Sequence, residues 1–193
     1  MKYTVAFDTS SSDLFLPSVD CGPSCSGHKA YDPSASANSQ NLGVSFEIHV
    51  ENGASVSGEQ YSDVVQIAGL TVCRSTPRFF LSLYADVPYQ ANNQTLGLAT
   101  NYPTNLQSSQ FAADGLMGLA FESISAYNAT PVFQTLISQD VLTSPVFGLK
   151  LATSGSELFL GGTNDTLFTG NFTWVPLTNQ VCNDMKALIT FKR

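Results

Sequence analysis

Apolar and polar side chains alternate at the start of the chain. Residues 3–8 read Tyr-Thr-Val-Ala-Phe-Asp, and a period of two is typical of a strand with one buried face. This strand therefore ends at an aspartate, Asp8. Because the pattern begins almost at Met1, and a domain rarely opens in the middle of a strand, we expect earlier strands of the domain to be missing from the chain.

Short apolar segments farther along the chain also predict strands. Each is bounded by Gly, Asn, Ser or Pro, the residues that most often form turns. The segments are residues 44–50, 61–67, 146–151, 157–160 and 171–177. The chain is therefore expected to consist mostly of β-structure.

One segment carries the signals of a helix. Thr130 is the expected N-cap and Pro131 the first helical residue, a position where the missing N–H of proline costs no hydrogen bond. The apolar residues at 132, 133, 136 and 137 share one face, and the helix is expected to end near Gln139. The predicted fold class is thus all-β with one short helix.

Charged residues are sparse. Asp, Glu, Lys and Arg make up 12% of the 193 residues, about half the usual share of roughly 25%, and the net charge is −7. An acidic surface does not attract nucleic acid or an anionic membrane, so neither is expected as a partner. A chain with few Lys and Arg also gains little positive self-repulsion when its carboxylates protonate, which suits acidic surroundings.

Two segments differ from this overall composition. Five of the eight Lys and Arg side chains fall within residues 72–90 and 181–193. Cys73 and Cys182, two of the four cysteines, lie in the same two segments. Their composition sets both segments apart from the rest of the chain.

The remaining two cysteines lie close together in Cys-Gly-Pro-Ser-Cys. This spacing predicts a local disulfide between Cys21 and Cys25. A free or metal-binding pair is the alternative, although no second Cys/His cluster completes a zinc site.

Other short motifs favour an oxidising, secretory location. Four Asn-x-Ser/Thr acceptors for glycosylation are present, at Asn93, Asn128, Asn164 and Asn171. No signal peptide is present, and no apolar run approaches the roughly 18 residues that a membrane span needs. Secretion would therefore require a leader that is missing from this chain.

The segment around Asp8 reads Phe-Asp-Thr-Ser-Ser-Ser-Asp-Leu-Phe-Leu-Pro-Ser. An aspartate in a turn of small hydroxyl residues is, by itself, more often structural than catalytic. The segment nevertheless resembles the first active-site motif of the pepsin-like aspartic proteases, Asp-Thr-Gly-Ser-Ser-Asp-Leu-Trp-Val-Pro-Ser. The resemblance covers nearly all of residues 3–180 outside 72–90, and it continues in chain order through VSGEQYSDVVQIAGL, DGLMGLAFESIS, TPVFQTLISQ, SELFLGGTN and FTWVPL.

This resemblance implies that residues 1–180 form one lobe of a pepsin-like acid protease, which cleaves polypeptides without a cofactor or a metal. In that family two aspartates, one from each lobe, share a proton and a water, and their like charges separate their pKa values. Asp8 would be the first aspartate, Thr9 the hydroxyl that braces the two loops and Ser11 the hydroxyl that orients the carboxylate. The loop that carries Asp8 would be supported by Leu116, Met117 and Gly118.

The chain departs from the family motif within the site itself. Ser10 replaces a glycine, which adds a side chain where the backbone approaches the paired loop and the substrate. Val50 stands at the position of the flap tyrosine, Glu51 at the adjacent glycine and Phe15 at a tryptophan. No second Asp-Thr-Gly or Asp-Ser-Gly occurs, so Asp8 has no partner in the chain and we expect the C-terminal lobe to be missing.

The segment 72–90 has no counterpart in the family. Deleting it joins Thr71 to Ala91 in a family-like sequence, and its codons can supply the donor, branch point and acceptor of a short fungal intron. The tail 181–193 begins with the same Val-Cys pair. We interpret both segments as translated intron sequence; a genuine surface loop and a genuine tail are the alternative.

Taken together, these features predict an extracellular or vacuolar aspartic endopeptidase, present here as a single lobe without activity. Two alternatives remain open: two copies could pair their Asp8 side chains, or the fold could serve as a non-catalytic binding or inhibitor module. The changes at Ser10 and Val50 favour the second alternative. Serine-hydrolase chemistry is not indicated, because no Gly-x-Ser-x-Gly motif occurs, and no glycine-rich phosphate loop is present either.

Overall fold

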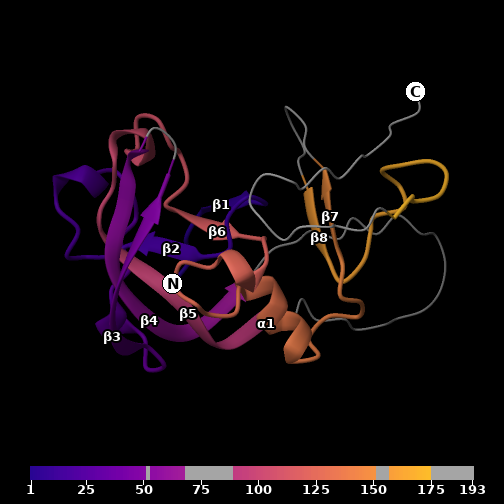
Figure 1. The fold of residues 1–193 in the computed structure, drawn as a ribbon, viewed down its shortest axis with the longest axis horizontal. Coiled ribbons are helices and arrows are strands. Elements are labelled where there is room, and N and C mark those ends of the chain that lie inside the picture. The colour runs from indigo at the N-terminus through magenta and orange to yellow at the C-terminus, as the bar shows by residue number, and fades with distance from the viewer. Residues whose placement is uncertain (51–52, 68–88, 151–156, 175–193) are drawn as a thin grey trace.

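The computed structural model describes residues 1–50, 53–67, 89–150 and 157–174. Within these ranges the chain forms a six-stranded sheet and a separate hairpin, with one short α-helix (Figure 1). The predicted fold class, all-β with one short helix, is confirmed. The strands are β1 (Val5–Asp8), β2 (Leu14–Pro17), β3 (Gln40–His49), β4 (Ser55–Ile67), β5 (Tyr89–Asn101), β6 (Gly115–Gly118), β7 (Phe147–Lys150) and β8 (Glu157–Leu160), and the helix is α1 (Val132–Ser138).

The order of strands in the sheet is β1-β6-β2-β5-β4-β3. At one end of it, β6 lies between β1, to which it is parallel, and β2, to which it is antiparallel. The chain thus leaves β1 at Asp8, turns, and re-enters the sheet as β2 on the far side of β6. In the register of the β1–β6 pair, Asp8 lies opposite Gly118.

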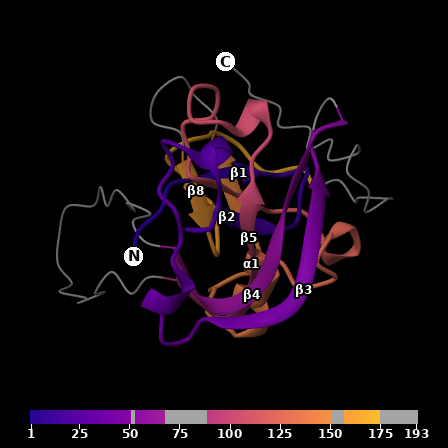
Figure 2. The same cartoon turned by 90° about the vertical axis from the view of Figure 1, so that its left-hand side faces the viewer.

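At the other end of the sheet, β4 runs antiparallel to both β3 and β5, whereas β5 is parallel to β2. Figure 2 shows β3 and β4 as two long strands lying side by side. These strands form the hairpin that carries the predicted flap position. Their pairing is irregular between Asn41 and Ser45, and the β4–β5 pair is irregular between Ser57 and Gly58 and again between Asp63 and Val65.

Both faces of the central strand β2 are buried, and its side chains alternate between two apolar clusters. Leu14 and Leu16 enter the first cluster, whereas Phe15 enters the second. The first cluster also contains Leu136 of α1 and Leu158 of β8, so the helix and the β7–β8 hairpin cover one face of the sheet. The second cluster lies under the flap hairpin and includes Phe46, Val56, Tyr102 and Tyr127.

The structure differs from the sequence-based prediction at several elements. The predicted strands 44–50, 61–67, 146–151 and 157–160 are present, most with shifted ends, but β2, β5 and β6 were not predicted. Residues 171–174, within the predicted strand 171–177, are not part of a strand, and 175–177 lie outside the described residues. Strand β2 escaped prediction because a strand buried on both faces shows no alternation of apolar and polar residues.

The start of α1 also differs from the prediction. The helix begins at Val132, so Pro131 is the N-cap and contributes no side-chain hydrogen bond. The Thr130 hydroxyl donates to the Glu122 carboxylate (2.9 Å). It therefore does not cap the helix, although the end of the helix, with Gln139 as its C-cap, agrees with the prediction.

The carboxylate of Asp114 fastens the edge strand β1 to the rest of the sheet. It accepts hydrogen bonds from the backbone N–H of Thr4 (2.8 Å), from the Thr4 hydroxyl (2.8 Å) and from the backbone N–H of Lys29 (2.7 Å). Burial acts to raise the pKa of the Asp114 carboxyl, but the hydrogen bonds from Lys29 and Thr4 outweigh it and lower the pKa below the ordinary value of 3.8. The charged form of Asp114 therefore stabilises the fold.

We predict that Asp114→Asn destabilises the protein by roughly 1–2 kcal/mol at about pH 6, because the amide replaces one of the two acceptor oxygens. A lowered pKa in the folded state contributes stability that is present above pH 3.8 and is lost as the pH falls through the folded value. The difference between wild type and variant, measured by urea unfolding, should therefore shrink below that pH. A constant difference from about pH 6 to about pH 3 would contradict this assignment.

Candidate active site

Asp8 lies at the end of β1 and is half-buried. Its Oδ1 atom accepts two hydrogen bonds from the same residue, one from the Ser10 backbone N–H (2.9 Å) and one from the Ser10 hydroxyl (2.7 Å). The sequence predicts Ser11 in this orienting role. The structure instead leaves the Ser11 hydroxyl oxygen buried and without a hydrogen-bond partner among the described residues.

Backbone hydrogen bonds from β6 and the residues that follow it fix the turn after Asp8. Leu119 donates its backbone N–H to the carbonyl of Asp8 (2.8 Å), and Ala120 donates to the carbonyl of Ser11 (2.9 Å). Gly118 donates to the carbonyl of Asp13 (2.9 Å). These three bonds bring together segments more than a hundred residues apart in the sequence.

Gly118 lies against the backbone of this turn. A Cβ atom at position 118 would lie 2.4 Å from the carbonyl carbon of Ser12 and 2.5 Å from the carbonyl oxygen of Ser11. Real Cβ atoms essentially never approach other atoms so closely. Position 118 therefore requires glycine if the turn is to keep its place above β6.

A second carboxylate, that of Asp13, anchors the far end of the turn and was not predicted from the sequence. It is 7% exposed, and it accepts hydrogen bonds from the Ser125 hydroxyl (2.6 Å) and the Ala126 backbone N–H (2.7 Å). Burial raises the pKa of Asp13, and the hydrogen bonds from Ser125 and Ala126 partly offset this effect. The sequence signals for this anchor were its place beside the apolar run of β2 and its match to the second aspartate of the family motif.

The other predicted support residues lie around the turn. Thr9 is half-buried. Met117 is buried in the first apolar cluster, and Leu116 packs against the second. Leu116 to Gly118 thus lie in β6, directly beside β1, where the sequence predicts support for the turn.

The predicted flap position lies in the β3–β4 hairpin. The backbone N–H of Val50 donates to the carbonyl of Ala54 (2.9 Å). The Val50 side chain is half-buried and packs against the second apolar cluster, so it offers no hydrogen-bond donor to a substrate. Glu51 lies outside the described residues.

Comparisons with known proteins agree with this geometry. The family model described as eukaryotic aspartyl protease matches residues 1–79 and 87–188. The chain belongs to this family. It is 34% identical over 180 residues to an aspartic protease of Phaffia rhodozyma, 35% over 184 to pepsin A of Suncus murinus and 34% over 185 to cathepsin E of Cavia porcellus.

Each of these alignments covers 93% of this aspartyl protease chain but only 39–42% of the relative. The chain thus spans about two fifths of the length of the curated relatives it matches. The family match skips residues 80–86 but includes the rest of the segment 72–90 and residues 181–188 of the tail. Residues 72–88 and the tail 181–193 lie outside the described part of the structure.

In this aspartyl protease chain, Cys21 and Cys25 are joined by a disulfide, as their spacing predicts. Three of the four predicted glycosylation acceptors have exposed side chains: Asn93, Asn128 and Asn171. The fourth, Asn164, is half-buried; it donates to the Glu157 carboxylate (2.9 Å) and accepts from the Thr166 backbone N–H and hydroxyl.

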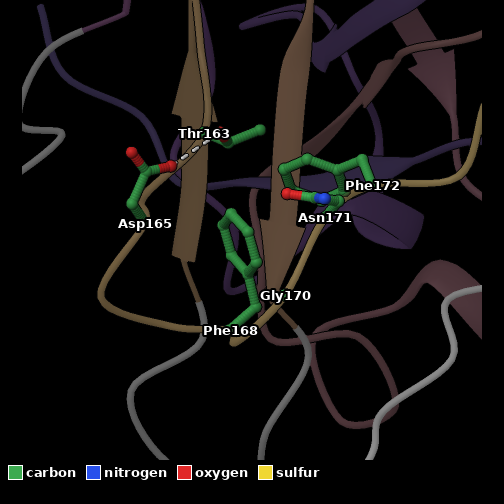
Figure 3. Close-up of a pocket in the computed structure, with 6 residues that line it drawn as sticks. All are labelled: Thr163, Asp165, Phe168, Gly170, Asn171 and Phe172. Carbon is green, nitrogen blue, oxygen red and sulfur yellow. Dashed lines mark hydrogen bonds between the residues drawn. The ribbon is translucent and has the colours of Figure 1, made fainter.

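A surface cavity of about 520 Å³ lies in the segment that follows β8 (Figure 3). Figure 3 shows the Thr163 hydroxyl bonded to the Asp165 carboxylate on one side of it. Of the predicted site residues, only Asn171 lines the cavity, and neither Asp8 nor its turn contributes. This cavity is therefore separate from the candidate active site.

The described ranges contain no group of three or more His, Cys, Asp or Glu side chains that could hold a metal ion. They also contain no helix that is both long enough and apolar enough to cross a membrane.

We predict that Gly118→Ala destabilises the chain by about 1–3 kcal/mol, because the added methyl group forces the turn away from β6. Gly22→Ala is the matched control, since a Cβ at position 22 meets nothing within 4 Å. Urea unfolding of both variants measures the difference. Equal stability of the two would show that the turn does not pack against position 118 as described.

Proposed function

We propose that this chain is the N-terminal lobe of a pepsin-like aspartic endopeptidase and that Asp8 is the first of its two catalytic carboxylates. The observation that supports this most directly is the position of Asp8. Asp8 lies at the end of β1, and its carboxylate accepts two hydrogen bonds from Ser10. The backbone of the turn that follows is hydrogen-bonded to β6 and to the residues after it. A catalytic acid must be held in this way if a water and a peptide carbonyl are to meet it in one geometry.

The chemistry proposed for the family needs a second acid. One carboxylate removes a proton from water while the other donates to the carbonyl oxygen, and the pair shares one proton because like charges so close cannot both ionise readily. The sequence contains no second Asp-Thr-Gly or Asp-Ser-Gly. A monomer of this chain is therefore expected to show no proteolysis, and Val50 in place of the flap tyrosine acts in the same direction.

The proposed partner of this lobe is a second, C-terminal lobe. Several apolar side chains are exposed on the described surface, and a second lobe could cover part of them. They include Phe7 (38% exposed), Phe172 (49%) and Trp174 (75%). The proposed substrates of the complete enzyme are polypeptides, cleaved between bulky apolar residues at acid pH.

The proposed location is extracellular or vacuolar, reached by the secretory route. The Cys21–Cys25 disulfide is compatible with an oxidising compartment. The four glycosylation acceptors and the scarcity of basic residues point the same way.

We predict that the purified monomer does not digest acid-denatured globin at acid pH, and that Asp8→Asn behaves identically. The assay should be run over a range of protein concentrations with sedimentation measured in parallel. Digestion by the monomer that Asp8→Asn abolishes would refute the requirement for a second lobe. Activity that rises with the square of concentration would instead support a dimer that pairs two Asp8 side chains.

The non-catalytic alternative gives a different result in the same preparation. A binding or inhibitor module would bind a protein partner equally well before and after Asp8→Asn. Such binding, together with the absence of digestion at every concentration, would favour that function over a protease lobe.

We also propose that 72–90 and 181–193 are translated intron sequence. The register of β4 and β5 is compatible with this for the first segment, because removing 72–90 loses only the pairs Gln66–Gln90 and Ile67–Tyr89. Residues 66–71 would then form the loop that connects Val65 of β4 to its partner Ala91 of β5. A connection of that size is within the usual range of about 2–6 residues.

RNA sequencing across codons 70–92 is expected to show reads that join codon 71 to codon 91. The matching protein variant, with 72–90 deleted, should still unfold cooperatively in urea, because the β4–β5 pairs from Val65–Ala91 onward are unchanged. Reads that run evenly through the segment, or a deletion variant that fails to fold, would contradict the proposal.

A further inference from the structure

The interaction that distinguishes this site is the double hydrogen bond from Ser10 to Asp8. Both donors reach the same atom, Oδ1, at 2.9 Å from the backbone N–H and 2.7 Å from the hydroxyl. A carboxylate oxygen has two lone-pair sites, so the two hydrogen bonds from Ser10 occupy both acceptor sites of Oδ1. Among the described residues, no hydrogen bond reaches Oδ2 of Asp8.

The same arrangement occurs at two other places in the chain. Asp32 Oδ1 accepts from the Ser34 N–H (2.9 Å) and hydroxyl (2.6 Å), and Asn164 Oδ1 accepts from the Thr166 N–H (3.1 Å) and hydroxyl (2.7 Å). At Asp32 the motif caps a short 3₁₀ helix, η2 (Pro33–Ala35). At these three places an acid or amide is bonded by a Ser or Thr two residues later in a self-contained turn, and Asp8 with Ser10 is one of them.

Neighbouring hydroxyls do not share this contact. The Ser11 hydroxyl is buried and has no partner within the described part of the chain, and the Ser12 hydroxyl donates to the carbonyl of Phe121 (2.5 Å). Ser10 itself is exposed, so its hydroxyl is not held in place by packing. The bond to Asp8 therefore reflects the attraction between this hydroxyl and the carboxylate.

We propose that Ser10 is a positioning residue for Asp8: its hydroxyl and amide hold Oδ1 and leave Oδ2 as the oxygen that a water or a second acid meets. A glycine at position 10 would supply only the amide and would leave one more lone pair of Oδ1 available to a shared proton. This inference rests on the proposed role of Asp8 in proteolysis. It adds that residue 10 selects which oxygen of the acid is presented.

The first experiment detects the hydrogen bond itself. In a ¹H–¹⁵N spectrum followed through a pH titration, the Ser10 amide proton should move downfield as Asp8 loses its proton, since an N–H bonded to a charged carboxylate is deshielded. Asp8→Asn should abolish this movement and leave that of Ser34, which reports on Asp32, unchanged. A Ser10 amide that does not respond to Asp8 would overturn the proposal.

The second experiment measures how firmly the carboxylate is held. Carbodiimide-promoted amidation of the wild type and three variants, followed by mass spectrometry, gives labelling rates for Asp8 and Asp32 separately. Ser10→Ala should raise labelling of Asp8 by about threefold, because one of two charge-assisted bonds is lost, whereas Ser10→Thr keeps the hydroxyl and should restore the wild-type rate. Ser34→Ala is the matched control and should raise labelling of Asp32 alone.

The outcomes separate this inference from the proposed function, because neither experiment requires proteolysis. An unchanged Asp8 rate in Ser10→Ala, or a rise at Asp8 and Asp32 together, would show that Ser10 does not position the acid. If the chain shows the Ser10-dependent effects but has no protease activity in any assembly, the positioning role of Ser10 stands and only the proposed reaction is refuted.

Discussion

The close contact between Gly118 and the turn that follows Asp8 is the constraint on which the candidate site depends. A turn that carries a charged side chain out of a strand has few hydrogen bonds of its own. Here β6 and the residues after it supply them, because the backbone N–H groups of Gly118, Leu119 and Ala120 all point to carbonyls of the turn. The absence of a Cβ at 118 lets the two backbones approach closely enough for these bonds to form.

The carboxyl groups of Asp114 and Asp13 also affect the stability of this region, and their effects depend on pH in opposite directions. Asp114 has a lowered pKa, so its charged form stabilises the fold and protonation weakens it. Asp13 has a raised pKa because it is buried. The protonated form of Asp13 therefore contributes to the stability of the fold below pH 3.8, the ordinary pKa of the group. This contribution is lost as the pH rises through the pKa of Asp13 in the folded protein. The two effects oppose each other as the pH falls, which limits the dependence of the fold on acidity.

The backbone support around Asp8 is present in this chain, with the turn, its glycine and its anchoring carboxylate all in place. The proposed reaction also needs a second acid, and the sequence contains no second Asp-Thr-Gly or Asp-Ser-Gly motif to supply it. The chain spans about two fifths of its curated relatives, which is consistent with one lobe of a two-lobed enzyme. Ser10 changes the immediate surroundings of Asp8 more than any other substitution, because it contacts the carboxylate directly.

Features that depend on neighbours along the chain were evident from the sequence by itself. Strand β1 and its terminal aspartate followed from alternation, the Cys21–Cys25 disulfide from spacing, and the end of α1 from its apolar pattern. The sequence also identified the family, because its motifs recur in a fixed order. Each of these depends on a few consecutive residues, whose side-chain periodicity and spacing are already present in the unfolded chain.

Tertiary structure alone decided which residues meet across the sheet. Strand β2 is buried on both faces, and only the assembled clusters show where Leu14 and Phe15 point. The anchoring of Asp13 by Ser125 joins residues 112 positions apart, and the bond from the Leu119 N–H to the Asp8 carbonyl joins residues that are also far apart in the sequence. Such contacts are set by the packing of distant strands, which no local pattern of side chains encodes.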